Sequence, residues 1–264
     1  MLDQGISIML APLLLIQGLH VHRKTPRLAE PKGERMGQTG ASPTLSVLIL
    51  GDSAAAGVGV LHQQQALLGQ VVEQLAPLGD LSFNLFAKTG ATTASTLQTF
   101  EKNIHSSHPI LSQPHFDVII TSLGVNDVTS PIRCDKWLEQ QTQLIMLLTQ
   151  RYSPKHILLT AVPPLGLFPA LPNPLRWSLG KKAQRFNRQL QLQVDRFNGT
   201  TNNTQFSLIH LPLEKPEQHS SMLAFMAQVM ATDGFHPGAQ IYTAWAKRIA
   251  AEINAEMPSA QEKN

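Results

Sequence analysis

The sequence predicts a single three-layer α/β/α domain with a parallel sheet at its centre. Short apolar runs, typical of buried strands, alternate along the chain with longer segments in which apolar residues recur at helical spacing. Strands that alternate with helices imply right-handed crossovers, which place helices on both faces of a parallel sheet. The chain has 264 residues, of which 42% are hydrophobic and 15% charged, so it can bury a core of its own.

Five segments are predicted to be strands, because each is a short apolar run. They cover residues 45–50, 81–87, 116–123, 156–162 and 205–210. Five longer segments have the apolar spacing of helices. They cover residues 61–75, 93–104, 137–149, 179–197 and 238–253. Between the fourth strand and the next helix, the proline-rich stretch 163–174 predicts an irregular loop.

Composition divides the chain into three parts: an N-terminal apolar segment with a linker (1–43), the folded domain (44–257) and a polar tail (258–264). Residues 6–19 are mostly apolar, but as a helix they reach only about 21 Å, short of the roughly 30 Å core of a bilayer. An acid precedes them and bases follow, the reverse of a signal peptide. Two interpretations stay open: a helix lying in an anionic membrane surface, and a helix packed on the protein. We expect a cytoplasmic protein, associated with the inner face of the membrane in the first case.

Composition also argues against several classes of function. The net charge is +3, but the bases are scattered and only 6% of residues are aromatic, so no nucleic-acid partner is predicted. Cys134 is the only cysteine, so the chain cannot form an internal disulfide. Apart from His236, the histidines have no acidic or cysteine cluster beside them, which argues against a metal site.

Unusual polar residues gather where the predicted strands end. Ser53, in Gly51-Asp52-Ser53, follows the first strand, Gly90 follows the second, and Gly124-Val125-Asn126-Asp127 follows the third. A fourth group, Asp233-Gly234-Phe235-His236, precedes the last helix. Ligands of open α/β sheets bind outside the carboxyl ends of the strands. We therefore expect these groups to meet at one edge of the sheet.

The four groups contain the parts that ester hydrolysis needs. A serine nucleophile requires a base, a group that orients the base, and donors that face the developing oxyanion. Ser53 is the candidate nucleophile, His236 the candidate base, and Asp233 is close enough in sequence to orient the imidazole. The backbone N–H groups of Ser53 and Gly90 and the side-chain amide of Asn126 are the candidate oxyanion donors.

In order and setting, these groups resemble the four blocks of the SGNH hydrolases, also called GDSL-type lipases and esterases. The resemblance runs from about residue 45 to the last helix, and the small residues after Ser53 are similar to a bacterial branch. It implies a flavodoxin-like sheet of five parallel strands in the order 2-1-3-4-5. It also implies a triad and an oxyanion hole, with no metal or organic cofactor; the residues are Ser53, Asp233 and His236, with Gly90 and Asn126. Ala54 stands where the family often has leucine, which alters the packing under the nucleophile.

Each candidate residue also has a structural interpretation. Ser53 alone is a common helix N-cap, Gly90 alone marks a tight turn, and Asn126 alone is an ordinary loop residue. We expect Asp52 and Asp127 to hold neighbouring loops rather than to take part in the chemistry.

Apolar side chains near the proline-rich loop and beside the base predict a substrate-binding wall, although packing of the loop on the protein would explain them equally. They are Leu165, Phe168, Trp177 and Phe235. The predicted function is a serine esterase for short to medium acyl esters, including lipid esters if residues 6–19 contact a membrane. The alternatives are an acyltransferase or carbohydrate deacetylase of the same fold, and a non-catalytic binding protein.

Overall fold

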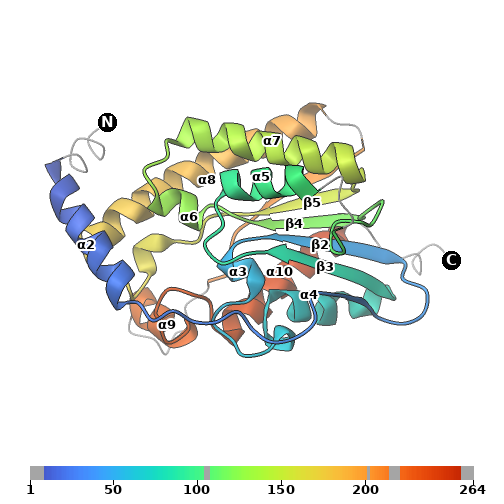
Figure 1. Cartoon of the computed structure of the whole chain (residues 1–264), viewed down its shortest axis with the longest axis horizontal. Helices are drawn as coiled ribbons and strands as arrows, with labels where there is room; N and C mark the ends of the chain where they lie inside the picture. The colour runs from blue at the N-terminus through green and yellow to red at the C-terminus, as the bar shows by residue number, and fades with distance from the viewer. Residues whose placement is uncertain (1–8, 104–107, 201–202, 214–220, 257–264) are drawn as a thin grey trace.

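The predicted parallel sheet lies at the centre of the structure (Figure 1). The computed structural model describes residues 9–103, 108–200, 203–213 and 221–256. Its sheet has six strands in the order β1-β3-β2-β4-β5-β6. Their bounds are Met36–Gln38 (β1), Leu45–Gly51 (β2), Leu81–Ala87 (β3), Val118–Ser122 (β4), His156–Thr160 (β5) and Gln205–Ile209 (β6).

The five strands expected from the apolar runs are parallel and have the expected neighbours. β2 pairs with β3 on one side and β4 on the other, and β5 and β6 continue the sheet beyond β4. Counted along the chain, these five strands have the order 2-1-3-4-5. Every residue of β4 and β5 is buried, which is why these strands are continuous apolar runs rather than alternating ones.

The sixth strand is a difference from the expected five. β1 pairs antiparallel with the outer edge of β3, in register from Met36 opposite Asn84 to Gln38 opposite Ser82. It lies in the stretch expected to be a linker. Its three residues are exposed, so main-chain hydrogen bonds rather than an apolar pattern define it, and the sequence carries little sign of it.

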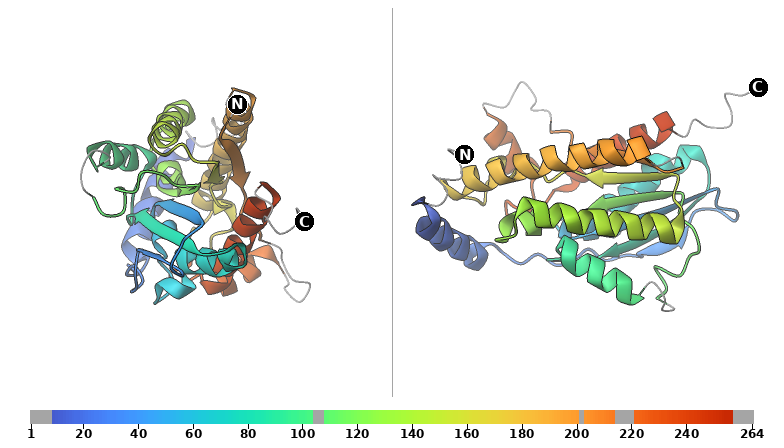
Figure 2. Two further views of the ribbon diagram at one scale, coloured as in Figure 1. Left: turned by 90° about the vertical axis from the view of Figure 1, so that its right-hand side faces the viewer. Right: turned by 90° about the horizontal axis from the view of Figure 1, so that it is seen from above.

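Helices cover both faces of the sheet, as the three-layer prediction requires (Figure 1). α5 (Thr93–Asn103), α7 (Cys134–Tyr152) and α8 (Leu175–Thr200) lie over one face, and α4 (Leu67–Leu75) and α10 (Ala239–Glu256) lie over the other. Figure 2, in the view from above, shows α7 and α8 side by side along the strands. Each face of the sheet therefore has its own apolar core.

The largest buried side chains fill these two cores. Under α7 and α8, Trp137 stacks on Phe186 with ring centroids 4.6 Å apart. Under α10, Tyr242 and Trp245 are almost fully buried against the sheet. Burial of aromatic side chains of this size contributes much of the free energy that holds helices on a sheet.

The structure differs from the predicted helices and loops at several places, of which the following bear on the site. The helix expected over 61–75 is a 3₁₀ turn, η1 (Gln63–Gln65), followed by α4, because Ala66 between them has an extended conformation. The proline-rich loop contains one short 3₁₀ turn, η3 (Leu165–Leu167), which uses the carbonyl groups of the prolines and needs no N–H from them. An unpredicted helix, α9 (Met222–Val229), precedes the histidine motif.

The N-terminal apolar segment forms α2 (Ala11–Lys24), which packs at one end of the molecule (Figure 1). Residues 6–8 of the predicted segment and the predicted tail 258–264 lie outside the described residues. Within the described ranges, no helix combines the length and the apolar character needed to cross a bilayer.

Candidate active site

Ser53 lies where β2 turns into a short helix. β2 ends at Gly51, and α3 spans Ser53–Ala56. The N-cap of α3 is Asp52, whose Oδ1 accepts a hydrogen bond from the N–H of Ala54 at 3.0 Å. Only glycine fits at position 51, because a Cβ there would lie 2.3 Å from the carbonyl oxygen of Ser122 in β4. The capping role that serine often has in such a turn thus belongs to Asp52.

His236 connects Ser53 with Asp233. The Oγ of Ser53 lies 3.0 Å from Nε2 of His236, and Nδ1 of the same ring lies 2.6 Å from Oδ2 of Asp233. The other carboxylate oxygen of Asp233 accepts hydrogen bonds from the backbone N–H groups of Phe235 and His236, both at 2.9 Å. Ser53 and His236 are 183 residues apart in the sequence, and the fold brings the turn at 233–236 next to the start of α3.

The Asp233 side chain is fully buried. Burial alone would raise the pKa of Asp233, but hydrogen bonds from the His236 ring and from two backbone N–H groups outweigh it and lower the pKa. A carboxylate at this place accepts a hydrogen bond from Nδ1–H and leaves Nε2 free to accept a proton from Ser53. The three side chains therefore have the geometry of a nucleophile, a base and an orienting acid.

Asp52 is a second buried carboxyl group beside this line. Burial raises the pKa of Asp52 to about 7, and the hydrogen bond from Ala54 and the nearby His236 only partly offset that effect. It lines the pocket next to Ser53. The structural role of Asp52 is to cap the N-terminus of α3, in agreement with the expectation that it holds a neighbouring loop.

The loops that carry Gly90 and Asn126 lie on either side of Ser53. They follow β3 and β4, the two strands that flank β2. Gly90 has a φ of +79°, a conformation that favours glycine. Asn126 lies in α6 (Val125–Thr129), and its Nδ2 donates a hydrogen bond to the carbonyl of Ala91 at 2.9 Å. A side-chain amide has two N–H groups, so the second can face a ligand.

The loop of Gly90 is held by a residue that the sequence did not single out. Both the backbone N–H and the hydroxyl of Thr89 donate hydrogen bonds to Oε1 of Glu30, at 2.9 and 2.6 Å. Arg35 pairs with the other oxygen of Glu30 and donates to the carbonyl of Ala87 at 2.9 Å. Residues 30–35 of the expected linker are therefore part of the site's support.

Asp127 has a structural contact of a similar kind. Its carboxylate, which is almost fully buried, accepts hydrogen bonds from the N–H and the hydroxyl of Thr93 at the start of α5. The Thr93 hydroxyl in turn accepts hydrogen bonds from Trp137 and Gln141 of α7. Asp127 therefore connects the Asn126 turn to α5 and α7. Among the described residues, no hydrogen bond joins Asp127 to Ser53.

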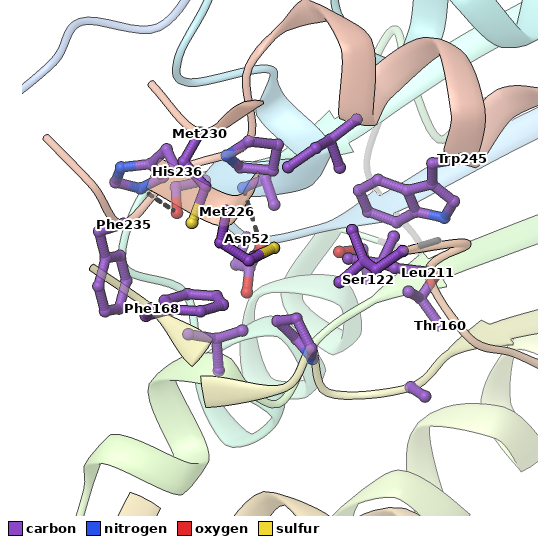
Figure 3. A pocket seen from close by; sticks show the side chains of 18 of the residues that line it. Asp52, Ser122, Thr160, Phe168, Leu211, Met226, Met230, Phe235, His236 and Trp245 are labelled. Carbon is purple, nitrogen blue, oxygen red and sulfur yellow. Dashed lines mark hydrogen bonds between the residues drawn. The ribbon is translucent and has the colours of Figure 1, made fainter. Parts of the chain in front are cut away.

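A pocket opens beside Ser53 and His236 and extends toward α10. In Figure 3, His236, Phe168 and Phe235 lie at one end of this pocket, and Thr160 and Trp245 lie at the other. Between them the lining is mostly apolar, and it includes the sulfur-containing side chains of Met226 in α9 and of Met230 directly after α9. The apolar residues of this lining include Leu123, Val125, Leu211, Leu213, Met226, Met230 and Ile241.

Two of the four predicted wall residues reach this pocket. Phe168 and Phe235 pack edge to face with ring centroids 5.3 Å apart, and Phe235 lies against the His236 ring. Leu165 is instead fully buried in the core under α8, and Trp177 lies on α8 away from the lining. The residues of α9 and of the segment after β6 were not predicted, because no chemical motif marks them.

The described residues contain no group of three or more histidine, cysteine, aspartate or glutamate side chains arranged to hold a metal ion.

Comparison with known families assigns the chain directly. The model of the GDSL-like lipase/acylhydrolase family matches residues 49–244. The chain belongs to this family. It is therefore a carboxylic ester hydrolase of the GDSL type, and the matched range begins within β2 and ends within α10.

Solved structures of GDSL-type and related enzymes share the fold. A lipase from a goat rumen metagenome matches with a TM-score of 0.58 and 18% identity, covering 79% of this chain and 97% of that chain. The esterase EstA of a Pseudoalteromonas species matches with a TM-score of 0.53 and 17% identity, covering 80% and 97%.

A family 2 carbohydrate esterase from Corynascus thermopiles (Myceliophthora fergusii) matches with a TM-score of 0.59 and 15% identity, covering 83% of this chain and 68% of that one. Identities this low show a common fold alone. Comparison with curated protein sequences gave no match.

Proposed function

We propose that this GDSL-type hydrolase is a serine esterase that cleaves short to medium acyl esters through an acyl-enzyme on Ser53. The observation that carries the proposal is the continuous hydrogen-bonded line from Ser53 Oγ through the His236 ring to Asp233. A hydroxyl in contact with a neutral imidazole can lose its proton as it attacks a carbonyl carbon.

The reaction has two halves. In the first, Ser53 Oγ forms a bond to the ester carbonyl carbon while His236 Nε2 takes the hydroxyl proton, and the tetrahedral intermediate then expels the alcohol, which receives that proton from His236. In the second half, His236 takes a proton from water, the resulting hydroxide attacks the acyl-enzyme, and Ser53 leaves with the proton. Asp233 keeps the ring oriented and stabilises the imidazolium in both halves.

The oxyanion of each intermediate would be stabilised by the N–H of Ser53, the N–H of Gly90 and the amide of Asn126. Ser53 lies in the first turn of α3, where backbone N–H groups have no partner within the helix. The positions of Gly90 and Asn126 in the loops beside β2 support their assignment. One such donor contributes roughly 2.7–4 kcal/mol to transition-state stabilisation.

The apolar lining favours an acyl chain as the group that occupies the pocket. Phe168 and Phe235 lie nearest the base, and the apolar wall continues with Met226 of α9 and Met230, which directly follows α9. Methionine adapts its shape to different ligands, which suits acyl chains of several lengths. A sugar would leave its hydroxyl groups without partners on these side chains.

An acyltransferase or a carbohydrate deacetylase remains the second candidate, because the same acyl-enzyme could form with either. The shared fold with carbohydrate esterases supports it at the level of the fold. Product analysis with a sugar acceptor separates these reactions: acyl transfer to the sugar would favour the transferase, and free acid as the only product would favour the esterase.

The proposal extends to lipid esters. α2 carries exposed apolar side chains next to a basic end, which supports peripheral contact of residues 6–19 with a membrane surface and a position on its cytoplasmic side.

A series of nitrophenyl esters of increasing acyl length tests the esterase. The wild type should turn over the short and medium members, and Ser53→Ala should lose at least about 10³-fold in kcat, because the nucleophile is gone. Ser112→Ala, at an exposed serine away from the pocket, is the matched control and should keep full activity. Undiminished turnover by Ser53→Ala would refute the assignment.

A further inference from the structure

One face of α2 attaches the helix to the protein. Leu14 and Val21 pack against the apolar core under α8. Between them in the helix, the Gln17 side chain donates a hydrogen bond to the carbonyl of Asn173 at 2.8 Å and accepts one from the N–H of Leu175 at 3.0 Å. α2 is thus held in a defined orientation on the start of α8.

The opposite face of α2 is apolar and exposed. Leu15, Ile16 and Leu19 have 65%, 64% and 51% of their surface exposed, and Leu13 has 43%. At 100° per residue, Leu15, Ile16 and Leu19 lie on the side of the helix away from Leu14 and Val21, whereas Leu13 lies on the flank between the two sides. We call Leu15, Ile16 and Leu19 the outer face of α2. Exposed apolar groups gathered in this way mark an interaction site more often than chance exposure does.

The end of this helix is basic. His22, Arg23 and Lys24 form its last turn, and Arg27 follows three residues later. The nearest acid along the described chain, Glu30, is already paired with Arg35. A row of apolar side chains that ends in bases with no ion pair to any described residue is complementary to a lipid surface with anionic headgroups.

The position of α2 relates this surface to the active site. α2 and α9 lie at the same end of the molecule, the end at which the parallel strands finish (Figure 1). Asn173 and Leu175, which hold α2, belong to the chain that leads from Phe168 in the pocket to α8. α9, which lines the pocket through Met226, has Leu223 and Phe225 half-exposed on its surface. The pocket and the outer face of α2 therefore share one end of the protein.

We infer that this end of the protein docks on an anionic lipid surface. The outer face of α2 enters the headgroup region, and Arg23, Lys24 and Arg27 bind lipid phosphates. Docking in this orientation holds the end of the sheet where the parallel strands finish, with Ser53 and the pocket, close to the lipid surface. The supply of lipid esters to Ser53 rests on the proposed esterase function, whereas docking itself does not.

Sedimentation with vesicles tests the docking, using the full chain and two vesicle compositions, phosphatidylcholine alone and phosphatidylcholine mixed with phosphatidylglycerol. The wild type should bind the anionic vesicles and bind the neutral ones weakly, and salt at about 0.5 M should weaken the anionic binding. The outer-face variant carries Leu15→Gln, Ile16→Gln and Leu19→Gln. Its binding to the anionic vesicles should be weaker than that of the wild type by at least roughly tenfold. Its matched control replaces three similarly exposed apolar residues elsewhere and should bind as the wild type does. These changes are Leu61→Gln, Met146→Gln and Leu192→Gln.

A second pair of variants tests the charges. Replacement of Arg23, Lys24 and Arg27 by Gln should reduce binding to the anionic vesicles by roughly tenfold or more. Replacement of three exposed bases elsewhere, Lys102, Arg196 and Lys247, by Gln should leave it unchanged.

Turnover of a soluble nitrophenyl ester, measured on every variant, separates docking from catalysis. It should stay at the wild-type level, which also shows that the variants are folded. Failure of the wild type to bind anionic vesicles, or equal binding by the outer-face variant, would overturn the inference. So would a dimer in solution that the outer-face variant converts to a monomer, because the outer face would then be a contact between two copies.

Discussion

Glu30 accepts two hydrogen bonds from Thr89, one from the backbone N–H and one from the hydroxyl. The pair joins the segment before β1 to the loop that follows β3, 59 residues later. Hydrogen bonds from Thr89 and the nearby Arg35 outweigh the effect of burial and lower the pKa of Glu30, so it accepts these bonds as a carboxylate. Gly90 comes directly after Thr89, so the Glu30–Thr89 contact fixes the backbone of a candidate oxyanion donor.

This contact predicts an effect of Glu30 on catalysis without contact to substrate. Glu30→Gln keeps the shape but removes the charge, so the loop should hold Gly90 less firmly. We expect kcat on a soluble ester to fall roughly tenfold with KM little changed, because the N–H of Gly90 would act mainly in the transition state. Glu34→Gln, an exposed acid of the same segment, is the control. A change in KM alone would contradict the role in positioning.

Asp233 is predicted to matter through the orientation of His236. Asp233→Asn presents an amide to Nδ1, and the ring can then rotate or adopt the other tautomer. By analogy with other serine triads, kcat should fall by roughly 10⁴-fold. The far-ultraviolet circular dichroism spectrum should match that of the wild type, since the backbone turn can persist. A variant that keeps more than a tenth of the wild-type kcat would show that the Asp233–His236 bond of 2.6 Å is not needed for catalysis.

Asp52 predicts a pH dependence of stability. Its pKa of about 7 in the folded protein lies above the ordinary value of 3.8, so the folded state holds this proton more tightly than the unfolded state. The free energy of unfolding should therefore fall as the pH rises between these two values, by up to about 1.4 kcal/mol per pH unit, and level off above them.

Asp52→Asn tests this dependence, because an amide oxygen can still cap α3 but carries no titratable group. Denaturant titrations from about pH 4 to pH 8 should show the wild type losing stability relative to the variant as the pH rises. Asp195→Asn, at an exposed position on α8, should run parallel to the wild type. Parallel curves for Asp52→Asn as well would contradict the raised pKa of Asp52 in the folded protein.

The pocket predicts which side chain sets the preference for acyl length. Phe235 is half-buried and lies between His236 and Phe168, so Phe235→Ala removes apolar contact without opening the core. KM for hexanoyl and octanoyl esters should rise several-fold, whereas KM for acetyl esters should change little. Trp177→Ala removes an aromatic side chain that does not line the pocket and should leave the series unchanged.

The sequence predicts the sheet well because each parallel strand is a continuous apolar run. It also predicts which residues meet at the edge of the sheet, because Ser53, Asp233 and His236 occupy short motifs whose chemistry is specific. The structure brings these three residues together in hydrogen bonds, as the motifs predict. Their roles in catalysis stay predictions that the variants above test.

The unpredicted parts depend on contacts between distant segments. β1 is three exposed residues held by main-chain hydrogen bonds, and Glu30 is an ordinary acid until Thr89 lies beside it. α9 spans only eight residues, which is too short for an apolar period to stand out. Leu165 and Trp177 were expected in the pocket because they lie near the loop in sequence, yet one points into the core and the other lies on α8.

Labelling with a serine-directed phosphonate is the most direct measurement of the central claim. The intact protein should gain the mass of one phosphonyl group, and peptide mass spectrometry should place that group on Ser53. Ser112→Ala should be labelled as fully as the wild type, and Ser53→Ala should not be labelled. A stable adduct on another residue, or labelling of Ser53→Ala at the wild-type rate, would contradict the assignment of Ser53 as the nucleophile.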